Sequence, residues 1–107
     1  MKSYTSESQT ARLIELGFEK PKSMNGEYNG LQFMPTPAYS IGELIEMLPM
    51  GINNDGRFED LIIHPNFHRW VVKYSGFFRV PTYLSCMKEL IDALYDMIVK
   101  LKEEEVI

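Results

Sequence analysis

The chain has a single cysteine, Cys86, among its 107 residues. One cysteine excludes an internal disulfide framework and fits a reducing compartment. No apolar run approaches the roughly 18 residues that a membrane-spanning helix needs, and the segment MKSYTSESQT lacks the apolar centre of a signal peptide. These absences predict a cytoplasmic protein with no membrane partner.

Sequence motifs for catalysis or cofactor binding are also missing. No glycine-rich phosphate loop, nucleophile elbow or paired-carboxylate arrangement occurs. His64 and His68 have the four-residue spacing of zinc ligands on a helix, but Pro65 lies between them and both flanks resemble strands. Cys86 lacks the surroundings of a catalytic thiol, and the oxygen-rich residues 53–60 do not have EF-hand spacing. We therefore expect no enzyme activity, metal, cofactor or small-molecule ligand.

Size and composition are those of one globular domain spanning residues 1–107. Hydrophobic residues make up 45% of the chain and charged residues 24%, which is ordinary for a folded protein. The net charge is −4, but Leu61 to Lys88 contains no Asp or Glu and carries a net charge of +4. We call residues 61–88 the basic segment. Net charge alone therefore does not exclude a nucleic-acid partner.

Two short helices are predicted in the first half of the chain. Thr5 or Ser6 can cap the first helix, with Gln9 completing a capping box and Gly17 ending the helix. The run Ser40-Ile41-Gly42-Glu43 is a second capping box, followed by apolar residues at helical spacing. Pro49 is expected to stop this second helix.

Turn-forming residues dominate two other stretches. Residues 19–38 contain three prolines and two Asn-Gly pairs, so we expect a surface excursion with at most one short strand, at Leu31 to Met34. Residues 53–56, Asn-Asn-Asp-Gly, predict a turn before the basic segment.

The basic segment is predicted to form a β-hairpin. Phe58 to His64 is the first strand, which Pro65 ends, and His68 to Tyr74 is the second. Residues 77–80 are a candidate third strand. Period-two alternation places a mainly apolar set on one face and a cationic set on the other: Trp70, Val72 and Tyr74 against Arg69, Val71 and Lys73.

A long C-terminal helix is predicted to start within residues 82–85 and to run to about Lys102. Its apolar positions cover an arc of roughly 200°, which is too wide for packing on one side only. Either the hairpin and the short helices cover this arc from two sides, or a partner shares it. Tyr95 and Val99 lie at the edge of the arc and are the candidate partner surface.

These elements predict an α+β fold: two short N-terminal helices, an antiparallel hairpin or three-stranded sheet, and a long C-terminal helix packed on it. The leading functional hypothesis is a non-catalytic protein-interaction or phage accessory protein, homo-oligomeric through the C-terminal helix. The alternative is a nucleic-acid-binding module that uses Arg69, Lys73 and Arg79 beside neighbouring aromatic residues. Against it, cations on a strand face commonly serve only to block edge pairing.

Three segments carry a resemblance to other proteins: Leu13 to Ser23, Tyr39 to Pro49 and Glu89 to Glu104. Together they resemble small uncharacterised proteins encoded by phages and mobile elements of gut bacteria, a group with no assigned activity. The resemblance weakens over Leu61 to Val80. It implies a bacterial, phage-linked setting and carries over no functional residue.

Overall fold

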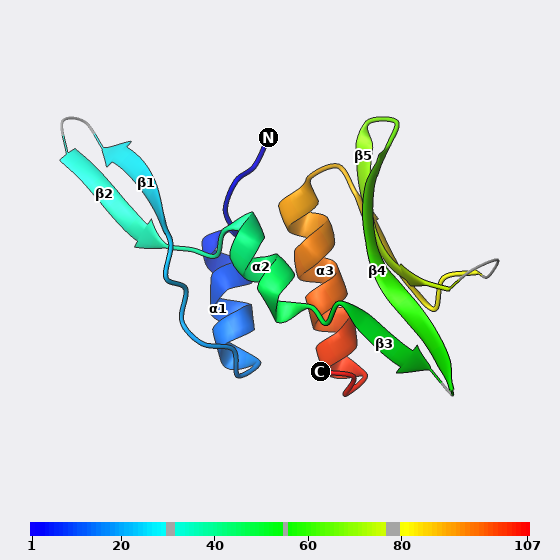
Figure 1. Cartoon of the computed structure of the whole chain (residues 1–107). Coiled ribbons are helices and arrows are strands. Elements are labelled where there is room, and N and C mark those ends of the chain that lie inside the picture. The colour runs from blue at the N-terminus through cyan, green and yellow to red at the C-terminus, as the bar shows by residue number, and fades with distance from the viewer. Residues whose placement is uncertain (30–31, 55, 77–79) are drawn as a thin grey trace.

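The computed structural model describes residues 1–29, 32–54, 56–76 and 80–107, which form three helices and six strands (Figure 1). In chain order the elements are α1 (Glu7–Glu15), β1 (Met24–Asn29), β2 (Gln32–Pro37), α2 (Ile41–Met47), β3 (Gly51–Asn54), β4 (Arg57–Asn66), β5 (Arg69–Ser75), β6 (Tyr83–Met87) and α3 (Leu90–Glu103). Strands β3, β4, β5 and β6 form one antiparallel sheet in sequence order, and β1 and β2 form a separate hairpin. The predicted α+β class, with a C-terminal helix packed on an antiparallel sheet, is confirmed.

The helices lie on one side of the four-stranded sheet (Figure 1). α3 contacts β5 and β6, α2 packs against α3, and α1 lies beyond α2. We call the sheet face under α3 the inner face and the opposite face the outer face. The β1–β2 hairpin extends away from this body, and the molecule measures 55 × 33 × 17 Å.

Both short helices begin as their capping boxes predict. The Ser6 hydroxyl accepts a hydrogen bond from the Gln9 amide, and the Gln9 side chain accepts one from the Ser6 amide at 2.9 Å. Ser40 and Glu43 make the same reciprocal pair at the start of α2. Gly17 follows α1 with a φ of +101°, a backbone conformation that residues with a side chain rarely adopt.

The expectation for residues 19–38 is wrong in form. Instead of an excursion with one short strand, β1 and β2 pair in register from Met24 opposite Pro37 to Asn29 opposite Gln32. Leu31, where the strand was expected to start, lies outside the described residues. Two prolines are tolerated in β2 because a two-stranded hairpin leaves one edge of each strand without a hydrogen-bonded neighbour.

β4 is longer than the predicted strand, whereas β5 has the predicted length and is shifted by one residue. β4 continues through Pro65, which lies opposite Trp70, and ends at Asn66. β3 pairs with β4 only as far as Asp60. The edge of β4 that faces β3 therefore has no neighbouring strand at Pro65, and the missing amide hydrogen of proline breaks no hydrogen bond there. Asn53 and Asn54, the first half of the expected 53–56 turn, belong to β3, a strand that the sequence did not predict. Gly56, with a φ of +82°, completes that turn by donating to Asn53.

The predicted start of the last helix is wrong. Residues 83–87 form β6, which pairs with β5 from Trp70 opposite Met87 to Tyr74 opposite Tyr83, and α3 begins only at Leu90. The apolar residues at 83–87 continue the helical spacing of α3, but these residues pair with β5 and form a strand instead. Of the candidate third strand, residues 77–79 lie outside the described residues and Val80 belongs to no strand.

The core lies between α3, the inner sheet face and α2. α3 buries seven residues: Leu90, Ile91, Ala93, Leu94, Met97, Ile98 and Leu101. From the sheet, Val72 and Tyr74 are fully buried, and from the short helices Leu13 and Leu44 are fully buried. None of the described helices is long and apolar enough to span a membrane.

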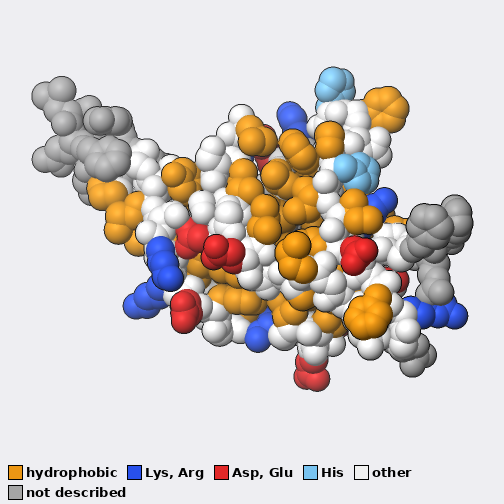
Figure 2. Space-filling view, viewed as in Figure 1, with side chains coloured by type: hydrophobic (Ala, Val, Ile, Leu, Met, Phe, Trp, Pro, Cys, Tyr) orange, Lys and Arg blue, Asp and Glu red, His pale blue; other side chains and the backbone are white. Residues whose placement is uncertain are grey.

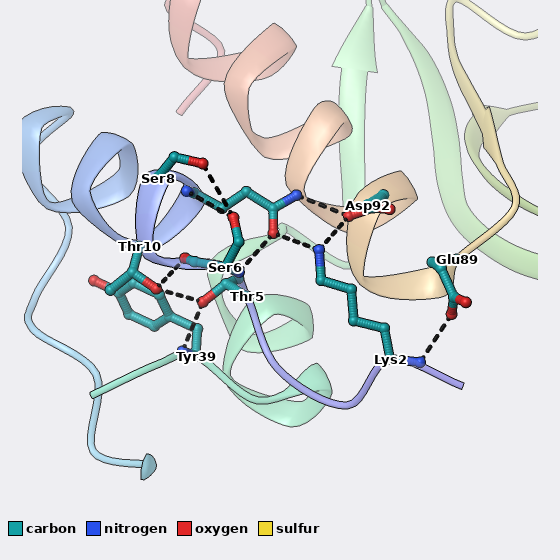
Figure 3. A network of polar contacts seen from close by, with 9 residues as sticks. Lys2, Thr5, Ser6, Ser8, Thr10, Tyr39, Glu89 and Asp92 are labelled. Atoms are coloured by element: carbon teal, nitrogen blue, oxygen red, sulfur yellow. Dashed lines mark hydrogen bonds and ion pairs between the residues drawn. The ribbon is translucent and has the colours of Figure 1, made fainter. Parts of the chain in front are cut away.

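A polar network ties the N-terminal segment to α1 and α3 (Figure 3). Lys2 Nζ donates to Asp92 at 2.9 Å and to Gln9 at 3.1 Å, and Gln9 also donates to Asp92. The Lys2 amide donates to Glu89, and the Thr5 hydroxyl accepts the Tyr39 amide. The contacts to Glu89 and Asp92 join residues 83 to 90 positions apart, so they close the chain around the start of α3.

Asp92→Asn tests this closure. Partial burial raises the pKa of Asp92, but hydrogen bonds from Lys2 and Gln9 and the Lys2 charge outweigh it, so the pKa lies below the ordinary 3.8. We expect the substitution to cost about 1 kcal/mol of unfolding free energy at neutral pH, because both partners are about one-third exposed. Urea unfolding followed by circular dichroism measures it.

The same substitution predicts a pH dependence. A carboxyl whose pKa is lowered by folding contributes its stability above its unfolded pKa and loses it as pH falls through the folded value. The gap between Asp92→Asn and the native chain should therefore be full at pH 7 and close as pH falls through the lowered pKa of Asp92. An equal gap at both pH values would show that the Asp92 charge contributes nothing.

Candidate functional site

Side chains that could bind a metal ion or act as a nucleophile are scattered over the described part of the structure. Within the described part of the chain, no three His, Cys, Asp or Glu residues gather in a way that could hold a metal ion. His68 is exposed at the β4–β5 tip, and His64 is half-buried with Nδ1 2.9 Å from the Pro65 carbonyl. Cys86 is exposed on β6. No described pocket joins these three residues, so the search turns to binding surfaces.

The predicted partner residues on α3 are half-buried. Tyr95 packs against the core, and Val99 is also only partly exposed. α3 touches the sheet on one side and α2 on another. The wide apolar arc is therefore covered from two sides by the chain itself, which was the first of the two arrangements that the sequence left open.

The outer face of the sheet carries exposed apolar side chains among its polar ones. Strand alternation places Phe58, Ile62, Val71, Leu84 and Cys86 there. Phe58 is 78% exposed and Leu84 49% exposed, whereas Val71 is 5% exposed although no described helix covers it. Exposed antiparallel faces usually alternate to polar residues. We call these five residues, together with Lys73 between Ile62 and Leu84, the outer patch.

The free edge of β6 is protected, unlike the outer patch. Lys100 Nζ donates to the Leu84 carbonyl at 2.8 Å and pairs with Asp96 at 2.9 Å. Asp96 in turn accepts from the Ser85 hydroxyl at 2.8 Å. A lysine held across an edge strand opposes pairing with another strand. Association through this sheet is therefore favoured at its face and not at this edge.

A second surface surrounds the tip of the β4–β5 hairpin, where Figure 2 shows hydrophobic and histidine side chains together. A hollow of about 410 Å³ lies there, lined by residues of the tip and by Lys88 and Glu89 just before α3. Met1 and Glu89 form part of its rim. The other lining residues are Pro65, Phe67, His68, Arg69, Trp70 and Lys88.

The cations predicted for nucleic-acid contact are only partly brought together. Arg69 lines the hollow, Lys73 lies on the outer face four residues further along β5, and Arg79 lies outside the described residues. Lys88, which the sequence did not single out, joins Arg69 at the hollow. Neither Arg69 nor Lys88 makes an ion pair with any described residue. The Glu89 carboxylate on the rim already accepts the Lys2 amide.

Phe67 is the most exposed large apolar residue at this site, at 97%. It occupies the first position of the two-residue loop between Asn66 and Arg69, with a φ of +57°. Glycine usually fills such a position, because a left-handed backbone is unfavourable for residues with a side chain. A bulky ring that is both strained and uncovered suggests a role outside the fold.

No protein-family model, curated protein or solved structure matches this chain. The fold and the two surfaces define a two-layer α+β protein with an open sheet face. Its function must therefore be argued from the surfaces themselves.

Sequence reasoning missed Lys88 and the outer patch as sites. The alternation along β5 signalled an outer face, but the apolar contribution of β6 could not be found while residues 83–87 were assigned to a helix. Phe67 is one of the aromatic residues that the sequence placed beside the predicted cations, between the two strands of the hairpin; its left-handed backbone was not predicted.

Phe67→Asn tests the strained loop position. Asparagine tolerates a left-handed backbone better than phenylalanine does, so we expect the variant to be more stable by about 0.5 to 1 kcal/mol. Phe67→Ala keeps the backbone penalty and removes only the ring, so its stability should match the native chain. Urea unfolding of all three proteins measures this. Destabilisation by both substitutions would mean that the ring contributes to the fold.

Proposed function

We propose that this chain is a non-catalytic protein-interaction protein that self-associates through the outer patch. The observation that carries the proposal is the set of exposed apolar side chains on the side of the sheet that no helix covers. Contiguous exposed apolar surface on a soluble domain marks interaction sites. A cytoplasmic location and a phage accessory role in a bacterium belong to the same proposal.

A second copy is the partner that this face fits best. Asp60 and Lys73 lie on adjacent strands of the outer face, two residue pairs apart in register. In a two-fold dimer each patch meets its own copy, so Lys73 of one chain can approach Asp60 of the other. The opposite charges therefore allow the two faces to meet without placing two lysines together.

The area of the outer sheet face sets the expected strength of self-association. Four strands spaced about 4.8 Å apart and about six residues long cover about 400 Å², or about 800 Å² for two copies. Stable interfaces bury about 1,200 to 2,000 Å² in total. We therefore expect weak, reversible association that depends on protein concentration.

Leu84→Lys tests the outer patch. A charge at this exposed position should abolish association, because it would have to be buried between two apolar faces. Sedimentation velocity over a range of protein concentrations should show a concentration-dependent shift for the native chain and a monomer for the variant. Met50→Lys is the matched control, because Met50 is 79% exposed but lies outside the outer patch.

Two results would contradict the proposal. If the native chain sediments as a monomer at every protein concentration, it does not self-associate. Loss of association with Val99→Lys but not with Leu84→Lys would move the interface to α3, where the sequence placed it.

A further inference from the structure

The hairpin-tip hollow combines exposed cations with aromatic rings. Arg69 and Lys88 are exposed cations with no ion-pair partner among the described residues. Phe67 and Trp70 supply aromatic rings on the same hollow, the first almost fully exposed and the second half-buried. The ligand class that needs cations beside aromatic faces is one with both anionic groups and flat rings.

We infer that this hollow is a binding site for single-stranded nucleic acid, distinct from the outer patch. Arg69 and Lys88 contact phosphates, and Phe67 stacks on an unpaired base. Base–aromatic stacking tolerates any sequence, and it requires bases that are not already stacked and paired in a duplex. The site should therefore prefer single strands to duplexes and show little sequence preference.

The shape of the site agrees with this ligand. A volume of about 410 Å³ is within the range of clefts that hold small organic groups, and the hollow is open on one side, as a continuous strand requires. Two cations, Arg69 and Lys88, line the hollow, and Glu89 is the one acidic residue in its lining. The Glu89 carboxylate already accepts the Lys2 amide.

Trp70 provides the measurement, because it is the only tryptophan of the chain and lines the hollow. Its fluorescence is titrated with an oligothymidylate of about 15 nucleotides and with a duplex of the same length. We expect saturable quenching by the single strand and at least tenfold weaker binding of the duplex, because stacking is lost. Anisotropy of a labelled oligonucleotide is the second readout, which does not depend on Trp70.

Salt dependence counts the phosphate contacts. Two contacts to a single strand predict that a tenfold increase in salt weakens binding about 25-fold. Arg69→Gln removes one contact, so the same increase should then weaken binding only about fivefold. Arg57→Gln is the matched control, because it removes the same charge from the opposite end of the β4–β5 hairpin. Its salt dependence should equal that of the native chain.

Phe67→Asn tests stacking separately from charge. We expect it to weaken oligothymidylate binding about tenfold or more without changing the salt dependence. Because this variant is predicted to be at least as stable as the native chain, a loss of binding cannot be attributed to unfolding. Leu84→Lys should leave oligonucleotide binding unchanged, so this proposal and self-association can fail independently.

Three outcomes overturn the inference. The first is absence of binding by both readouts at low salt. The second is equal affinity for duplex and single strand, which would indicate a purely electrostatic contact. The third is a response of Trp70 to vesicles of anionic phospholipid but not to oligonucleotides, which would assign the exposed ring and the cations to a membrane surface.

Discussion

The packing of α3 between the inner sheet face and α2 is the constraint on which the rest of this structure depends. Its seven buried residues supply the largest share of the core, and it alone contacts both the sheet and the short helices among the described elements. An antiparallel sheet with neither face covered would lack a core. α3 gives β5 and β6 a buried side and lets Val72 and Tyr74 be fully enclosed.

This arrangement also decides which surfaces stay open. Because α1, α2 and α3 lie on the same side, none of the described helices covers the outer patch (Figure 1). The Lys2 network holds the N-terminal segment beside the start of α3, so the hairpin tip and Lys88 form a hollow at that end. Lys100 donates a hydrogen bond to the Leu84 carbonyl and so blocks the edge of β6 from pairing with another strand. The open surfaces are thus a face and a tip, each with its own chemistry.

Features set by neighbouring residues could be predicted from the sequence. Both capping boxes form within four residues of chain, so no tertiary contact is needed to specify them. The alternation of β5 correctly separated Val72 and Tyr74 from Arg69 and Lys73. The boundaries failed where pairing between distant residues decides the structure. Pro65 stays in a strand because β3 has already ended, and residues 83–87 form a strand because β5 lies beside them.

The sequence by itself determined the class of the fold, the starts of α1 and α2, the amphipathic character of α3 and the basic segment. Each depends on residue type at short spacing, which chain-local hydrogen bonding and periodicity convert into structure. Only the tertiary structure decided that Tyr95 and Val99 are half-buried, that Arg69 and Lys88 share a hollow, and that Leu84 faces solvent. Those outcomes depend on which strand pairs with which, and the free energy of pairing resides in contacts between residues far apart in the chain.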